Sequence, residues 1–165
     1  MLFTQGVKLM SHSMKIWEKV IERRLRDESD ITQNQFGFMP GRGTTDAIFA
    51  LRHLCEKYRH AKKNLHMVFV DLEKAYDRVP REVLWWALKE TCVPGKYVEL
   101  IRSMYNRCCT RVRSAAGTTD KFGVTVGLHQ GSALSPYLFL LVMDALSSDI
   151  HEEAPMTLCL LVKTN

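Results

Sequence analysis

Val-Phe-Val-Asp-Leu-Glu-Lys-Ala-Tyr-Asp, residues 68–77, is the most informative segment of this chain. The apolar, β-branched and aromatic run over residues 66–71 predicts a buried strand that ends at Asp71. A side chain at a strand end is held rigidly, so it can coordinate a metal ion. Mg²⁺ needs only one or two protein carboxylates together with water and substrate phosphates. The alternative is a structural strand whose final Asp caps a turn.

Two further segments carry glycines beside polar side chains. Residues 127–136 read Gly-Leu-His-Gln-Gly-Ser-Ala-Leu-Ser-Pro, and residues 35–43 read Gln-Phe-Gly-Phe-Met-Pro-Gly-Arg-Gly. Glycine has no Cβ, so its backbone can approach a ligand closely. With these three blocks in this order, the chain resembles the reverse transcriptase domain of non-LTR (LINE-like) retrotransposons from about residue 6 to about residue 155.

The resemblance implies RNA-directed DNA synthesis from deoxynucleoside triphosphates, with an RNA template and a DNA primer as partners. It implies that Asp71 is the catalytic residue and binds Mg²⁺. Tyr76 matches the position at which a bulky ring excludes a 2′-hydroxyl, although a packed turn aromatic is the alternative. Gln130 and Gly131 match the block that contacts the nucleotide or the template, where the Gln130 amide can both donate and accept hydrogen bonds. For Asp77 we expect a turn or a supporting hydrogen bond.

Three arginines are further candidates for phosphate contacts. Arg42 lies in the glycine-rich block and could hold a triphosphate through its bidentate guanidinium, or it is a solvent-exposed loop arginine. Arg23 and Arg24 end a predicted amphipathic helix over residues 8–26. They either form a solvated face with internal ion pairs or, as the resemblance implies, lie near nucleic-acid phosphates.

The C-terminal segment departs from the family pattern. Reverse transcriptases place an aromatic-Ala-Asp-Asp motif on a hairpin after the second glycine block, where this chain has Val162 and Lys163, and no Asp or Glu follows Glu153. A two-metal site needs carboxylates from both places. The sequence therefore predicts a truncated fragment that is inactive alone. The alternative function is a non-catalytic nucleic-acid-binding remnant.

The predicted fold class is α/β (α+β): fingers at about residues 6–66 and a partial palm at about 67–165 without a thumb, with helices packed on a short, mostly antiparallel sheet. Helices are expected over 8–26, after a cap at Thr44 or Thr45, after Pro80, over 97–108, and from 135 to near 150, with a hairpin around Gly117. In the first helix, Ile16, Val20 and Ile21 are expected to form the apolar face, extended by Trp17 and Leu25.

Composition limits the remaining classes of protein. The 165 residues carry 23 Lys and Arg against 18 Asp and Glu, a net charge of +5 that suits a phosphate-rich partner. The five cysteines form no Cys-x-x-Cys pair and no secretory signal is visible, so we expect an intracellular protein of the cytoplasm or nucleus. The longest apolar run falls well short of the ~20 residues that a membrane span needs.

Overall fold

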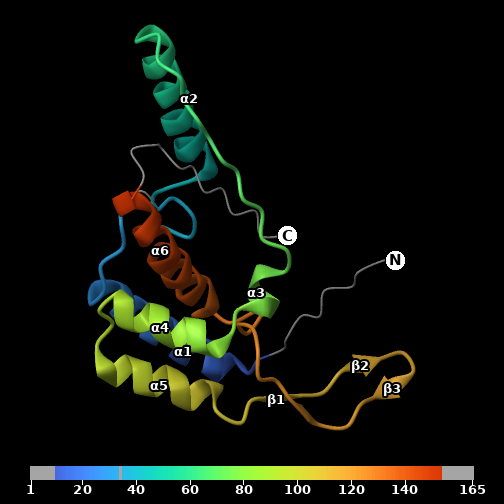
Figure 1. Cartoon of the computed structure of the whole chain (residues 1–165). Coiled ribbons are helices and arrows are strands. Elements are labelled where there is room, and N and C mark those ends of the chain that lie inside the picture. The colour runs from blue at the N-terminus through green and yellow to red at the C-terminus, as the bar shows by residue number, and fades with distance from the viewer. Residues whose placement is uncertain (1–9, 34, 154–165) are drawn as a thin grey trace.

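The computed structural model describes residues 10–33 and 35–153. It contains helices and very short strands (Figure 1). In chain order these are α1 (His12–Asp27), α2 (Thr44–His60), α3 (Ala75–Arg78), α4 (Arg81–Glu90), α5 (Gly95–Tyr105), β1 (Cys109–Thr110), β2 (Arg113–Ser114), β3 (Gly117–Thr118), β4 (Phe122–Gly123) and α6 (Ser135–Glu153). The helices begin close to the residues expected from the sequence.

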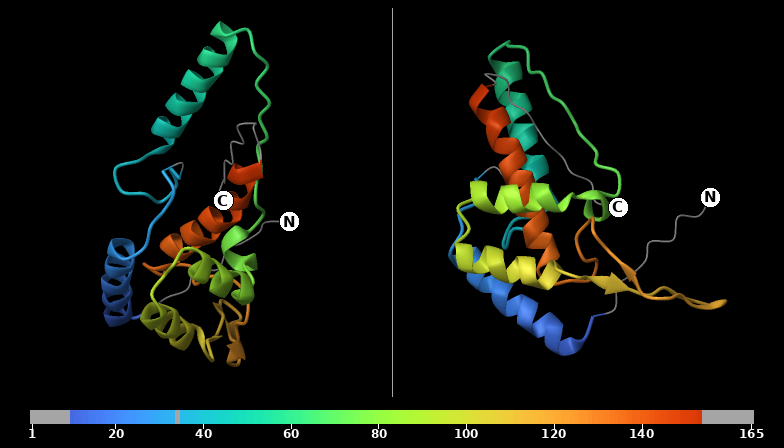
Figure 2. Two further views of the ribbon diagram at one scale, coloured as in Figure 1. Left: turned by 60° about the vertical axis from the view of Figure 1, so that its left-hand side comes forward. Right: turned by 60° about the horizontal axis from the view of Figure 1, so that its bottom comes forward.

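The core is built from helices that pack on α6. Residues 137–143 of α6 are all buried, so this helix is apolar on every side, as expected for an element at the centre of a core. Leu84 and Leu88 of α4 and Ile101 of α5 are fully buried in the same cluster. Both views in Figure 2 show α1, α4 and α5 gathered near the first half of α6.

The buried face of α1 differs from the predicted one. Ile21 and Leu25 are buried, but Ile16 and Val20 are 67% and 41% exposed and Trp17 is 51% exposed. Two neighbouring apolar stripes run along this helix, and periodicity alone does not choose between them. The structure buries the stripe that also contains Glu18.

Helix α2 stands apart from the helical core (Figures 1 and 2). It begins at Thr44, so its cap is Gly43 and not the predicted Thr44 or Thr45, and the Gly43 amide donates to Asp46 Oδ2 at 2.7 Å. None of its residues is buried, and Ile48 and Phe49 are 62% and 71% exposed. Its apolar spacing therefore predicted a helix correctly, although that face is at most half-buried, as at Leu51, Leu54 and Tyr58.

The strand predicted over residues 66–71 is absent from the structure. The segment has no regular secondary structure, and Val68 and Phe69 are 52% and 57% exposed. An isolated strand is not stable, because its amides and carbonyls need a neighbouring strand. Within the described part of the chain, the ladders join only β1 to β4 and β2 to β3, so no partner strand reaches this segment.

The predicted hairpin around Gly117 is confirmed. Ser114 lies opposite Gly117 in the β2–β3 pair, and Cys109 lies opposite Gly123 in the antiparallel β1–β4 pair. These strands are largely exposed, and Figure 1 shows them projecting from the helices. Helices plus a small antiparallel sheet agree with the α+β class. The expected packing of helices on a sheet is wrong, since the described core consists of helix against helix.

Candidate functional site

Two of the three sequence blocks meet at the short helix α3. The Gly127 amide donates to the Val79 carbonyl at 2.9 Å, and the Leu128 amide donates to the Tyr76 carbonyl at 2.6 Å. These backbone bonds join the segment 76–79 to a loop some fifty residues downstream. The loop that carries Gln130 and Gly131 is thereby fixed beside the turn that follows Asp71.

Gly127 permits this close approach. A Cβ built on Gly127 would lie 2.6 Å from the carbonyl oxygen of Asp77 and 2.9 Å from its Cα, distances that real Cβ atoms do not show. Its φ of +82° is also in the left-handed region that favours glycine. Any larger residue would therefore push the loop away from α3.

Gln130 faces Asp77 across this contact. Its Nε2 donates a hydrogen bond to Asp77 Oδ1 at 3.0 Å. The supporting hydrogen bond expected for Asp77 is therefore present. This bond fixes the orientation of the Gln130 amide, while Gly131 next to it is exposed and has a φ of +81°.

Tyr76 brings the third block to the same place. Its ring stacks on Phe139 of α6, with centroids 4.8 Å apart, and meets the edge of Phe38 at 6.3 Å. Phe38 belongs to the glycine-rich block of residues 35–43, so all three blocks meet at Tyr76, where Phe38 contacts its ring and Leu128 its backbone carbonyl. Burial raises the pKa of the Tyr76 hydroxyl to about 12, so the group is neutral at physiological pH.

Asp71 lies at the end of the extended segment that leads into α3, and it is exposed. Its carboxylate has no hydrogen-bond or ion-pair partner among the described residues. Asp144, a possible second carboxylate, is buried and accepts hydrogen bonds from the Thr32 amide at 3.3 Å and from the Thr32 hydroxyl. Within residues 10–33 and 35–153, no three His, Cys, Asp or Glu side chains gather as a metal site.

The guanidinium of Arg42 is engaged within its own loop. It donates to the carbonyl oxygens of Gln33 and Gln35, the latter at 3.0 Å, and lies 5.4 Å from the centre of the Phe36 ring. Arg42 is thus an exposed loop arginine, as the alternative expected, and its guanidinium also holds the glycine-rich loop together. Its contact with a triphosphate remains a prediction.

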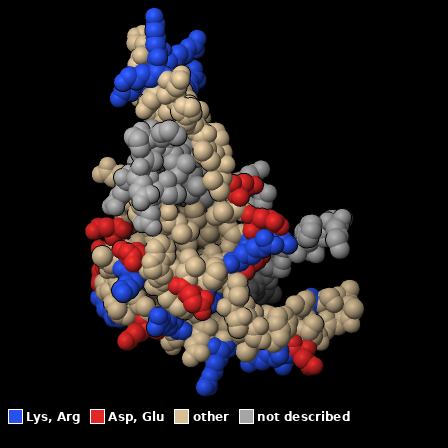
Figure 3. Space-filling model, viewed as in Figure 1, with Lys and Arg blue, Asp and Glu red and all other residues tan. Residues whose placement is uncertain are grey.

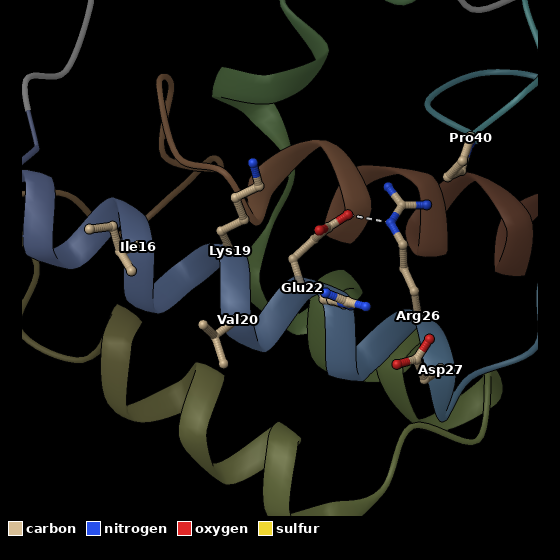
Figure 4. A pocket seen from close by; sticks show the side chains of 8 residues that line it. Ile16, Lys19, Val20, Glu22, Arg26, Asp27 and Pro40 are labelled. Atoms are coloured by element: carbon tan, nitrogen blue, oxygen red, sulfur yellow. Dashed lines mark hydrogen bonds and ion pairs between the residues drawn. The ribbon is translucent and has the colours of Figure 1, made fainter.

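Arg23 and Arg24 are exposed near the end of α1. Arg23 lines an open cleft of about 470 Å³ between α1 and Pro40, beside Lys19 and the Arg26–Glu22 ion pair (Figure 4). A cleft with basic side chains on an apolar floor suits a phosphate-bearing ligand. Two acidic side chains in the same wall, Glu22 and Asp27, reduce its positive charge.

Gly127 and Glu18 have structural roles that the sequence alone did not reveal. A glycine that opens the block at 127–136 is a signal for a tight backbone approach, but its partner segment is visible only in the structure. Glu18 shares the i, i+3, i+7 spacing of the buried Ile21 and Leu25. A carboxylate on an apolar stripe signals a specific buried partner, once the stripe itself is identified.

No helix in the described ranges combines the length and apolar character of a membrane span.

Comparison with known proteins agrees with the family resemblance of the three sequence blocks. A family model described as "Reverse transcriptase (RNA-dependent DNA polymerase)" matches residues 5–162. Enzymes of this family bind nucleic-acid templates and nucleotides and use divalent metal ions.

Similar curated proteins come from transposable elements. The chain is 29% identical over 140 residues to a probable RNA-directed DNA polymerase from transposon BS of Drosophila melanogaster, covering 81% of this chain and 15% of that protein. It is also 29% identical over 113 residues to the Pol polyprotein of the type-1 retrotransposable element R2 of Popillia japonica, covering 68% of this chain and 19% of that protein. The chain thus spans less than a fifth of the length of these two relatives. It belongs to the reverse transcriptase (RNA-dependent DNA polymerase) family, and its relatives are polymerases of non-LTR retrotransposons.

Proposed function

We propose that this chain forms the nucleotide-facing part of a polymerase that copies RNA into DNA, with fingers at about residues 6–66 and part of the palm at about 67–165. The observation that supports it is the meeting of the three family blocks around Tyr76, through Phe38, the Gly127 loop and α3. Residues that bind one nucleotide must converge on one place, and these blocks do so.

In this proposal each side chain that matches the family pattern has a separate contact with the nucleotide. Asp71 would hold a metal ion that supplies positive charge for the triphosphate, and the Tyr76 ring lies under the sugar and excludes a 2′-hydroxyl. Gln130 and Gly131 contact the nucleotide or the template strand, with the Gln130 amide oriented by Asp77. Arg42 contacts the triphosphate through the guanidinium nitrogens that its loop leaves unused.

The residues present fit a single Mg²⁺ but not a pair. One exposed carboxylate with substrate phosphates and water suffices for one Mg²⁺ ion, which would neutralise phosphate charge there. A pair of ions needs further carboxylates, and no group of three possible metal ligands gathers among the described residues. We therefore assign nucleotide binding to this site and derive no catalytic step from it.

Discrimination between sugars tests the proposal. Binding of a fluorescent deoxynucleoside triphosphate and its ribonucleotide counterpart is measured with Mg²⁺ and an RNA–DNA primer–template. The wild type should prefer the deoxynucleotide by about tenfold or more, corresponding to about 1.4 kcal/mol. Tyr76→Ala should remove the preference, whereas Tyr58→Ala, a change of a half-buried tyrosine on α2, should keep it. A folded wild type without any preference would contradict the proposal.

The basic surface favours nucleic-acid binding without catalysis as a second candidate function. Figure 3 shows lysines and arginines gathered at the far end of α2, where the chain carries Lys57, Arg59, Lys62 and Lys63, and Arg23 and Arg24 are exposed on α1. Each phosphate contact on single-stranded RNA contributes about 0.7 to the slope of log K against log salt.

Replacing two phosphate-binding arginines should change that slope measurably. We expect Arg23→Gln with Arg24→Gln to reduce the slope by about 1.4. Arg52→Gln is the control, because Arg52 already pairs with Glu56 at 3.2 Å. An unchanged slope in the double variant would remove these two residues from the interface, and no RNA binding at low salt would reject this candidate function.

A further inference from the structure

Glu18 is a buried carboxylate that the proposed site does not explain. It is 1% exposed on the face of α1 that also buries Ile21 and Leu25. Burying a carboxylate is costly unless it is hydrogen-bonded. Its Oε2 accepts a hydrogen bond from the Ala133 amide at 3.0 Å, across 115 residues of sequence.

Ala133 lies in the turn that opens α6. In the same turn, Ser132 Oγ accepts hydrogen bonds from the amides of Leu134 and Ser135 at 3.1 and 3.2 Å. The first amides of a helix have no partner within the helix, and this end carries partial positive charge. Glu18 and Ser132 together therefore satisfy three consecutive amides, those of Ala133 and Leu134 just before α6 and that of Ser135, its first residue, and the negative charge of Glu18 suits a position close to this helix end.

The turn held by Glu18 is continuous with the loop that carries Gln130. The Ser132 amide donates to the His129 carbonyl at 3.2 Å, so residues 129–132 form one tight turn. On the other side of this turn, the His129 ring stacks on Tyr105 at 4.3 Å, and the Arg81 guanidinium covers the same tyrosine at 4.0 Å. In the sequence, Gln130 thus lies between His129, which stacks on Tyr105, and Ala133, which Glu18 binds.

We propose that Glu18 is a positioning residue, which holds the Ala133 amide and thereby fixes Gln130 and Gly131 opposite Asp77. The inference rests on the proposed function only for what Gln130 binds. It assigns to α1, a helix of the predicted fingers, a direct part in shaping the nucleotide-facing loop. The hydrogen bond from Gln130 to Asp77 then depends on a contact made three residues further along the chain.

Amide hydrogen exchange of the 165-residue chain, followed by NMR, tests the anchor. A hydrogen bond to a charged acceptor is worth about 1.5–3 kcal/mol, so its loss should speed exchange of the Ala133 amide about 10- to 150-fold. Glu18→Met removes the acceptor at similar volume. Glu18→Gln keeps an acceptor oxygen without the charge, and we expect a smaller increase of about three- to tenfold.

Glu22 supplies the matched control. It lies one turn further along α1 and pairs with Arg26, so Glu22→Met and Glu22→Gln should leave Ala133 exchange within about twofold of the wild type. The side-chain amide signals of Gln130 should shift in Glu18→Met and stay in place in the Glu22 variants. If Glu18→Met does not fold, Glu18→Gln alone tests whether Glu18 holds the Ala133 amide. Ala133 exchange that stays within twofold in Glu18→Gln would overturn the proposal.

A nucleotide-binding measurement separates this inference from the function of the site. Glu18→Met should weaken deoxynucleotide binding about as much as Gln130→Ala does. Faster Ala133 exchange with unchanged nucleotide binding in both variants would support the anchor and reject the role of Gln130 in binding. Unchanged exchange would reject the anchor whatever the nucleotide affinity.

Discussion

Replacing Gly127 with alanine should destabilise the chain strongly, because the added methyl group has no space. The new Cβ would meet backbone atoms of Asp77 at 2.6–2.9 Å, and neither backbone can yield without breaking the bonds that join residues 76 and 79 to the loop. Alanine at a left-handed φ costs about 1–2 kcal/mol. Overpacking against a fixed neighbour adds about 1–3 kcal/mol. We expect Gly127→Ala to lower the free energy of unfolding by about 2–5 kcal/mol.

Gly41→Ala is the matched control for this prediction. Gly41 has a φ of +73°, close to the +82° of Gly127, but a Cβ there meets nothing within 4 Å. It should therefore cost only the backbone contribution of about 1–2 kcal/mol. Urea unfolding followed by circular dichroism gives both free energies. A cost for Gly127→Ala no larger than that for Gly41→Ala would refute the close approach of the loop to α3.

Three further predictions concern the neighbouring side chains. The bond between Gln130 and Asp77 should give a coupling of about 0.5 kcal/mol in a double-mutant cycle of Gln130→Ala and Asp77→Ala, and strict additivity would show that it does not form in solution. The 165-residue chain should show no primer extension on an RNA template with Mg²⁺ or Mn²⁺, like its Asp71→Ala variant; extension that Asp71→Ala abolishes would prove this wrong. Burial raises the pKa of Tyr76 from 10.0 to about 12, so the stabilisation that comes from its neutral form is complete below pH 10 and lost as the pH rises toward 12. Spectroscopic titration should show a tyrosine ionising near pH 12 that is absent in Tyr76→Phe, and equal titration curves would contradict it.

The sequence predicted the helices well, because their signals are local. Thr44 after Gly43, Pro80 before α4 and Ser135-Pro136 at α6 are start signals that need no knowledge of the rest of the chain. The face of α1 was not predictable in this way. Its two apolar stripes have similar periodicity, and the buried one is the stripe that packs in the core and from which Glu18 binds the distant Ala133 amide.

The sequence predicted which residues belong to the candidate site but not how they contact one another. The sequence named Tyr76, Gln130 and Gly131, and the resemblance indicated that they act together. It could not show that Asp77 orients Gln130 or that Gly127 makes the contact possible, because both depend on a meeting of segments fifty residues apart. The prediction of a strand over residues 66–71 was wrong for a different reason. Its local pattern is strong, but a strand also requires a neighbouring strand to pair with.

The attachment of α1 has a consequence for the order of folding. This helix leaves the ribosome well before α6. Three side chains of α1 and of the turn after it, however, make polar contacts with residues more than a hundred positions later in the chain. They join Glu18 to Ala133, Ser29 to Tyr137, and Thr32 to Asp144. Contacts of such long sequence separation form slowly, because a large loop must close before they stabilise anything. During synthesis α1 therefore lacks these contacts, and its apolar stripe stays accessible to chaperones, until α6 has been made.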